Sequence, residues 1–93
     1  MSVEPDMWGH VGSRRREEFE ELYRAQVRSL LAYALRRVDH PEQAADVVAE
    51  TMLVAWRRLD QVPPGDEARL WLFGVARRVL ANQRRGSARR DRL

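Results

Sequence analysis

Apolar residues recur at spacings of three and four along the first part of the chain, which is the period of an amphipathic helix. They are Phe19, Leu22, Tyr23, Val27, Leu30, Leu31, Ala34, Leu35 and Val38. Ser13 is a suitable N-cap, and Arg36 and Arg37 stand near the far end, where cations complement the helix dipole. The pattern predicts a helix over residues 14–38.

A second helix is predicted over residues 41–60, because Pro41 suits a first turn and Asp39 with Glu42 has the spacing of a capping box. Its core stripe would be Ala45, Val48, Met52, Ala55, Trp56 and Leu59. Val47, Leu53 and Val54 fall outside that stripe, among charged residues. Such an outward apolar set indicates a docking surface for another protein. A helix packed on two sides within its own domain explains the pattern equally well.

A third helix is predicted over residues 67–85, with its core stripe at Leu72, Phe73, Ala76, Val79 and Leu80. A short connector precedes it, shaped by two prolines and Gly65, and Asp66 is a suitable N-cap. Three such helices predict an all-α fold, a compact bundle. The domain would cover residues 13–85.

Both ends of the chain lack this periodicity. Residues 1–12 contain Pro5, Gly9 and Gly12, and they are expected to form a flexible leader. Gly86 interrupts the third helical pattern, so residues 86–93 are expected to begin a basic linker.

The composition is that of one small globular domain, with 44% hydrophobic and 33% charged residues in a chain of 93. Cysteine is absent, which excludes disulfides and thiolate metal sites. No apolar run is long enough to span a bilayer, and the first residues lack the pattern of a secretory signal. The chain is therefore expected to be cytoplasmic and without a membrane partner.

Charge is segregated along the chain more than the net charge of +3 indicates. All 17 basic residues are arginine, and from Arg77 onward there are seven arginines and one acid, Asp91. A basic end on a balanced domain is typical of a protein that binds a polyanion, most often nucleic acid. A basic tail that only aids solubility is the simpler explanation.

The third helix combines the side chains that contact nucleic acids: guanidinium groups for phosphates, amides for base edges and an indole ring for stacking. The candidates are Arg69, Trp71, Arg77, Arg78, Asn82, Arg84 and Arg85. For Trp71, a place in the core is favoured over a stacking role.

No catalytic grouping is recognisable, so no enzyme activity, cofactor or metal is expected. His40 has no partner at metal-ligand spacing and is interpreted as a solvated turn residue. Asp46 and Glu50 lie one helical turn apart, but a domain of this size offers little of the pocket that a catalytic carboxylate pair needs.

Three stretches, in this order, resemble the promoter-binding domain of extracytoplasmic-function (ECF) sigma factors, known as region 2. They are FEELYRAQVRSLLAYALRRV, AADVVAETMLVAWRRLDQV and LWLFGVARRVLANQRR. The most specific family pattern, D-V-V-x-E-T/A-F-x-x-A-W/Y-R, is matched by Asp46, Val47, Val48, Glu50, Thr51, Met52, Ala55, Trp56 and Arg57. A second pattern is matched by Trp71, Leu72, Phe73, Val75, Ala76 and Arg77.

This resemblance implies a sigma factor domain that binds core RNA polymerase and recognises and melts the promoter −10 element. In the family, the second helix docks on the clamp helices of the β′ subunit. The implied contacts are Asp46, Val47, Glu50, Thr51, Leu53, Val54 and Arg57.

The third helix of the family binds the −10 element, and the loop before it holds a base flipped out of the non-template strand. The implied flipped-base loop is Asp60, Gln61, Val62, Pro63, Pro64, Gly65 and Asp66. The DNA contacts are those proposed above for the third helix. An anti-sigma factor is a further expected partner.

The chain departs from the family pattern at Arg78, at Ala68 and at the two loop prolines. A complete ECF factor also carries a helix-turn-helix domain for the −35 element, so an excised domain or a short protein is expected. Two other classes stay open: a stand-alone nucleic-acid-binding regulator, and an interaction module sequestered by an anti-sigma factor.

Overall fold

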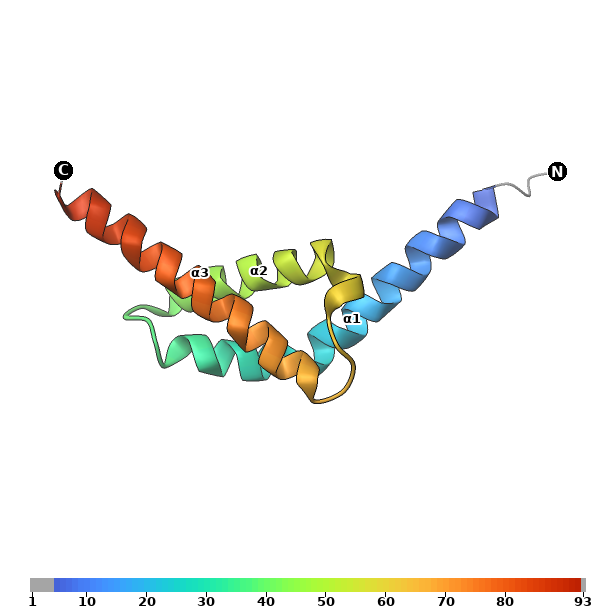
Figure 1. The fold of residues 1–93 in the computed structure, drawn as a ribbon, viewed down its shortest axis with the longest axis horizontal. Coiled ribbons are helices and arrows are strands. Elements are labelled where there is room, and N and C mark those ends of the chain that lie inside the picture. Colours follow the sequence, from blue (N-terminus) through green and yellow to red (C-terminus); the bar gives the residue numbers. More distant parts are fainter. Residues whose placement is uncertain (1–4, 93) are drawn as a thin grey trace.

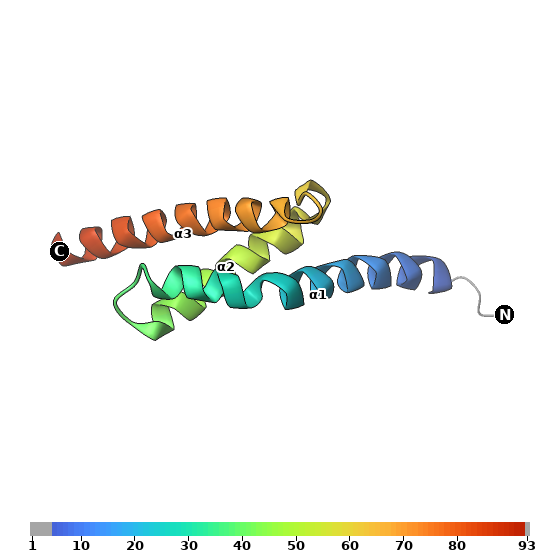
Figure 2. The ribbon, with the colours of Figure 1, turned by 90° about the horizontal axis from the view of Figure 1, so that it is seen from below.

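Figure 1 shows the computed structural model, which describes the backbone of residues 5–92 and the side chains of residues 13–86. Over that range the chain forms α1 (Pro5–Leu35), α2 (Pro41–Arg57), a 3-10 turn η1 (Leu59–Gln61) and α3 (Glu67–Arg92), with no strand. Each pair of the three α-helices is in contact. The N-terminal part of α1 and the C-terminal part of α3 project away from this packed region (Figures 1 and 2). The all-α bundle is confirmed.

The helix boundaries differ from the predicted ones at both ends of the chain. α1 begins at Pro5, not Arg14, so Ser13 lies inside the helix and does not cap it. α3 continues through Gly86 to Arg92. Glycine costs only about 1 kcal/mol relative to alanine in a helix, so neighbouring helical residues can carry the helix past it. Flexibility of the 1–12 leader stays a prediction, and residues 1–4 and 93 lie outside the described residues.

The first predicted helix ends earlier than expected, at the turn before α2, whereas α2 begins at Pro41 as predicted and ends at Arg57 instead of residue 60. α1 ends at Leu35, and α2 begins at Pro41 after an extended His40. The Gln43 side chain accepts hydrogen bonds from the backbone N–H groups of Asp39 and His40, each at 3.1 Å. The predicted pairing of Asp39 with Glu42 is thus displaced by one residue, because His40 is the residue that precedes the first helical turn.

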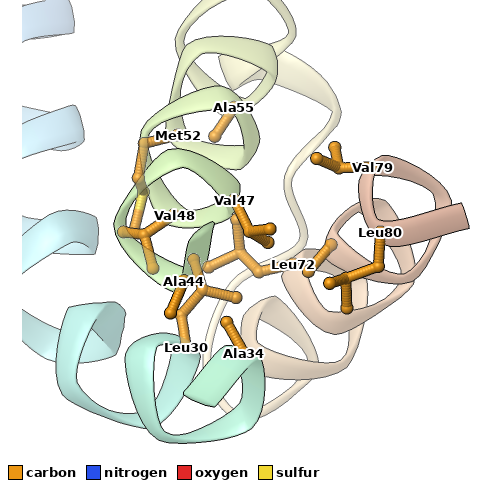
Figure 3. Close-up of a cluster of buried hydrophobic side chains, with 11 residues drawn as sticks. Leu30, Ala34, Ala44, Val47, Val48, Met52, Ala55, Leu72, Val79 and Leu80 are labelled. Atoms are coloured by element: carbon orange, nitrogen blue, oxygen red, sulfur yellow. The ribbon is translucent and has the colours of Figure 1, made fainter. Parts of the chain in front are cut away.

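The core is built from small and medium apolar side chains of all three helices, which point toward one another in Figure 3. Its buried members are Leu30, Ala34, Ala44, Val47, Val48, Met52, Ala55, Leu72, Ala76, Val79 and Leu80. Leu30, Leu72 and Val47 are fully buried. Because burying one such side chain is worth about 1.5–3 kcal/mol, this cluster supplies the main favourable free energy of the fold.

The predicted core stripe of α2 is partly confirmed: Val48, Met52 and Ala55 are buried, but the buried side of the helix is rotated from the predicted one toward Val47. Val47 is fully buried, whereas Ala45 and Trp56 are exposed. The physical reason is that α2 packs against both α1 and α3, so its buried arc is wide and turned toward the gap between them. The alternative of a helix packed on two sides therefore accounts for Val47. It does not account for Leu53, which is 46% exposed.

Candidate protein and nucleic-acid interfaces

The outer face of α2 carries four of the residues that the sequence assigned to polymerase binding. Asp46, Glu50, Leu53 and Arg57 are all exposed. Their spacing of four, three and four residues places them along one side of the helix. We call these four residues the α2 outer face. Its exposed leucine lies between two acids and one arginine, which makes this face a candidate surface for another protein.

The other three assigned residues are placed differently. Val47 and Thr51 are fully buried in the core, so in this structure neither side chain is exposed to a partner. Val54 is half-buried at the border of the outer face. The burial of Val47 and Thr51 could have been inferred from the sequence. Together with Ala44 and Ala55 they recur at spacings of three and four residues, which is a second helical stripe.

The polar residues assigned to DNA on α3 fall on two flanks of the helix. Arg77 and Arg84 are seven residues apart, both are exposed, and both line a depression that faces the end of α1. Arg78, Asn82 and Arg85 are exposed at spacings of four and three, which places them on a common face of α3. There the Arg85 side chain donates a hydrogen bond to Asn82 Oδ1. The set is therefore two adjoining cationic strips instead of one surface.

The start of α3 holds the remaining assigned residues. Arg69 is exposed, and its Nε donates to Gln26 Oε1 of α1 at 3.3 Å, which ties α3 to α1. Trp71 is half-buried and packs against the core cluster. Leu70 is 71% exposed, and the sequence analysis gave it no role. Leu70 is thus an exposed apolar side chain near the connector that only the structure identifies.

The predicted flipped-base loop begins within η1, which contains Asp60 and Gln61, and its middle packs on the bundle. Val62 is half-buried and packs against the core cluster, and Pro63 is half-buried as well. Gly65 has a φ of 66°, a left-handed conformation that side chains other than glycine disfavour. Asp60, Gln61, Pro64 and Asp66 are exposed. The loop thus has a fixed course with its polar side chains in solvent.

Two residues of the described depression were missed by the sequence analysis. Tyr33 and Arg37, near the end of α1, line it together with Arg77, Leu80, Ala81 and Arg84 of α3. Arg37 stood out in the sequence only as a cation near a helix end. Its position opposite Arg84 depends on how α1 and α3 pack, and no local pattern reports that.

Within residues whose side chains the structure describes, no three His, Asp or Glu side chains are grouped as a metal site would require. Over the same part of the chain, no helix is both long enough and apolar enough to cross a membrane.

Comparison with known proteins matches residues 22–90 to the family described as Sigma-70 region 2. The ECF RNA polymerase sigma factor SigL of Mycobacterium tuberculosis is 41% identical over 73 residues, which are 75% of this chain and 40% of that protein. The RNA polymerase sigma factor YlaC of Bacillus subtilis is 31% identical over 69 residues, which are 74% of this chain and 40% of that protein.

This chain thus spans about two fifths of the length of the curated relatives that it matches. No solved structure matches it. The helical bundle and the family match over most of the chain lead to one conclusion: the chain belongs to the Sigma-70 region 2 family.

Proposed function

We propose that this chain is the part of a sigma factor that binds core RNA polymerase and recognises and melts the promoter −10 element. Family membership supports the proposal, as do the relatives, which are named RNA polymerase sigma factors. The single observation that carries it is the α2 outer face. There Leu53 is 46% exposed between charged residues and is not a member of the buried core.

The polymerase contact is assigned to Asp46, Glu50, Leu53 and Arg57, with Val54 at its edge. Leu53 would be the apolar anchor that loses its water on docking. The charged residues around it would fix the orientation of the partner and speed the encounter. The proposed partner surface is the pair of β′ clamp helices.

Promoter contact is assigned to α3 and the loop before it. Arg69, Arg77, Arg78, Arg84 and Arg85 would neutralise phosphates, and Asn82 would contact a base edge. The loop from Asp60 to Asp66 would receive the flipped base. Flipping a base costs a few kcal/mol, which contacts to the extruded base and to the phosphates would offset.

An anti-sigma factor is a second proposed partner. It would compete for the α2 outer face, the arginine strips of α3, or both. Exposure of both surfaces on one small bundle supports this. Glutamine at Arg77 and Arg78 would then weaken binding of that protein as well as of DNA.

The deciding experiment for the polymerase contact is co-elution of the chain with a β′ clamp-helix fragment. The parent is expected to bind, and a variant carrying Asp46→Arg and Glu50→Arg is expected to lose at least about tenfold in affinity, because opposed charges become like charges across the contact. The matched control carries Glu17→Arg and Glu21→Arg on α1. Those two acids are also exposed, also four residues apart, and undergo the same charge reversal.

The control is expected to bind like the parent, and circular dichroism checks that all three proteins are folded. An equal loss of affinity in both variants would mean that the chain binds the fragment only through general electrostatic attraction. No binding by a folded parent would contradict the polymerase proposal and favour a stand-alone nucleic-acid-binding regulator.

A further inference from the structure

The depression between the end of α1 and the middle of α3 is the feature of interest. It has a volume of about 380 Å³ and is open to solvent on one side. Three of its six lining residues are arginines: Arg37, Arg77 and Arg84. Tyr33, Leu80 and Ala81 supply the rest of the wall. The C-terminal half of α1 runs beside α3 at this place (Figure 2).

Arg37 is held at the rim by two contacts. Its guanidinium carbon lies 3.6 Å from the centre of the Tyr33 ring, and its Nη1 donates to the Tyr33 carbonyl oxygen at 2.9 Å. The Tyr33 ring in turn stacks on Phe73 of α3, with 4.5 Å between the ring centres and 24° between the planes. The aromatic pair thus fixes Arg37 against α3, and much of the side-chain entropy is lost before any ligand arrives.

Arg84 connects the two helices directly. Its Nη2 donates to the carbonyl oxygen of Arg37 at 3.2 Å. This hydrogen bond brings the Arg84 guanidinium to the backbone of Arg37 in the turn after α1. Arg77 lies seven residues before Arg84, two helical turns away on the same side of α3. Three like charges therefore surround one small space.

None of the six residues that line the depression is a carboxylate, so its own lining does not balance these charges. Grouped cations repel one another, so their arrangement is relieved by an anion placed between them. A tetrahedral phosphate matches the fork geometry of several arginines at once.

We propose that this depression is a binding site for a single phosphate group, with Arg37, Arg77 and Arg84 as its ligands. Arg37 lies in the turn after α1, outside the set assigned to promoter contact. Where the phosphate belongs to a DNA backbone, the inference rests on the proposed function. Where it belongs to a free phosphate ester or pyrophosphate, the site is independent of that function.

The test is titration of the ¹⁵N-labelled chain with pyrophosphate at constant ionic strength, followed through the arginine Nε–H resonances. Saturable shifts are expected at Arg37, Arg77 and Arg84. Arg37→Gln is expected to weaken binding about tenfold, the loss of one charge-assisted contact. Arg36→Gln is the matched control, since Arg36 is the exposed neighbouring arginine that does not line the depression. It is expected to change the affinity less than about twofold.

Equal weakening by the two variants, or equal shifts at every arginine, would overturn the proposal. The same titration with a short single-stranded oligonucleotide identifies the source of the phosphate. Displacement of pyrophosphate by the oligonucleotide, with weaker DNA binding by Arg37→Gln, assigns the site to a nucleic-acid phosphate. Undisturbed pyrophosphate binding beside the oligonucleotide assigns it to a free phosphate compound. Both outcomes of this titration are independent of the β′ experiment, so they hold even if the β′ fragment does not bind the parent chain.

Discussion

At the scale of single residues, Thr51 is the polar side chain in the core. It is fully buried on α2, and its hydroxyl oxygen has no hydrogen-bond partner among the described residues. Burial of an unpaired hydroxyl lowers the stability of the fold. Because Thr51 is fully buried, its hydroxyl cannot recover that free energy by contact with another molecule at the surface.

Replacing this hydroxyl with a methyl group tests that argument. Thr51→Val keeps the shape of the side chain and removes the unpaired polar atom, so we expect the free energy of unfolding to rise by about 1 kcal/mol. Urea unfolding followed by circular dichroism measures it. Thr51→Ala is the control, because it removes the same hydroxyl but leaves a cavity and should not stabilise the chain. A less stable valine variant would mean that the hydroxyl has a partner in solution.

At the scale of elements, α1 and the end of α2 are joined by an arginine and two aromatic rings. The Phe19 ring meets the Trp56 ring edge-on, with 5.5 Å between ring centres and 79° between the planes. Arg15 lies 4.8 Å from the centre of the Trp56 ring, and its Nη2 donates to the Trp56 carbonyl oxygen at 2.8 Å. Trp56 is still 38% exposed, so the indole lies at the border of the core.

Removing the charge from this contact should loosen the two helices. Arg15→Gln is expected to lower the free energy of unfolding by about 1 kcal/mol, because it loses a cation–π contact and a hydrogen bond at a helix end. Arg16→Gln is the matched control, one residue away and exposed. Thermal or urea unfolding followed by circular dichroism compares the stabilities of the two variants. Indistinguishable stabilities would show that the Arg15 contact contributes nothing measurable.

At the scale of the whole molecule, two kinds of surface occupy different helices of one bundle. The α2 outer face combines two acids, one leucine and one arginine, whereas α3 carries its arginines on two adjoining strips. The described backbone is elongated, because parts of α1 and α3 extend beyond the packed region (Figure 1). Because the α2 outer face and the arginine strips of α3 lie on different helices, a protein partner and a polyanion can bind at the same time.

The polyanion side of this arrangement predicts a steep dependence of DNA binding on salt. The logarithm of the affinity for single-stranded DNA should fall linearly with the logarithm of salt concentration, by about 0.7 per neutralised phosphate. A variant with Arg78→Gln and Arg85→Gln should reduce that slope by about 1.4, as two contacts are lost. A control with Arg16→Gln and Arg28→Gln on α1 should keep the parent slope. Fluorescence anisotropy measures all three, and an unchanged slope in the α3 variant would exclude these two arginines as phosphate contacts.

The number of helices could be predicted from the local sequence pattern. A helix with one buried side shows an apolar period near 3.6 residues, whatever it packs against. The boundaries were less well predicted. Gly12 and Gly86 looked like helix breakers, yet helix passes through both, since a propensity cost of about 1 kcal/mol is a weak signal. The shift of the α2 cap from Asp39 to His40 is an error of the same local kind.

The sequence by itself thus determined the all-α class, the family resemblance, the concentration of arginine on α3, and the charged residues of the α2 outer face. Only the tertiary structure decided that Val47 and Thr51 are buried, because a helix between two neighbours buries an arc that its own periodicity does not locate. Only the tertiary structure brought Arg37 to Arg84, which are 47 residues apart. Contacts at such separations depend on how helices pack, and packing is a property of the whole chain.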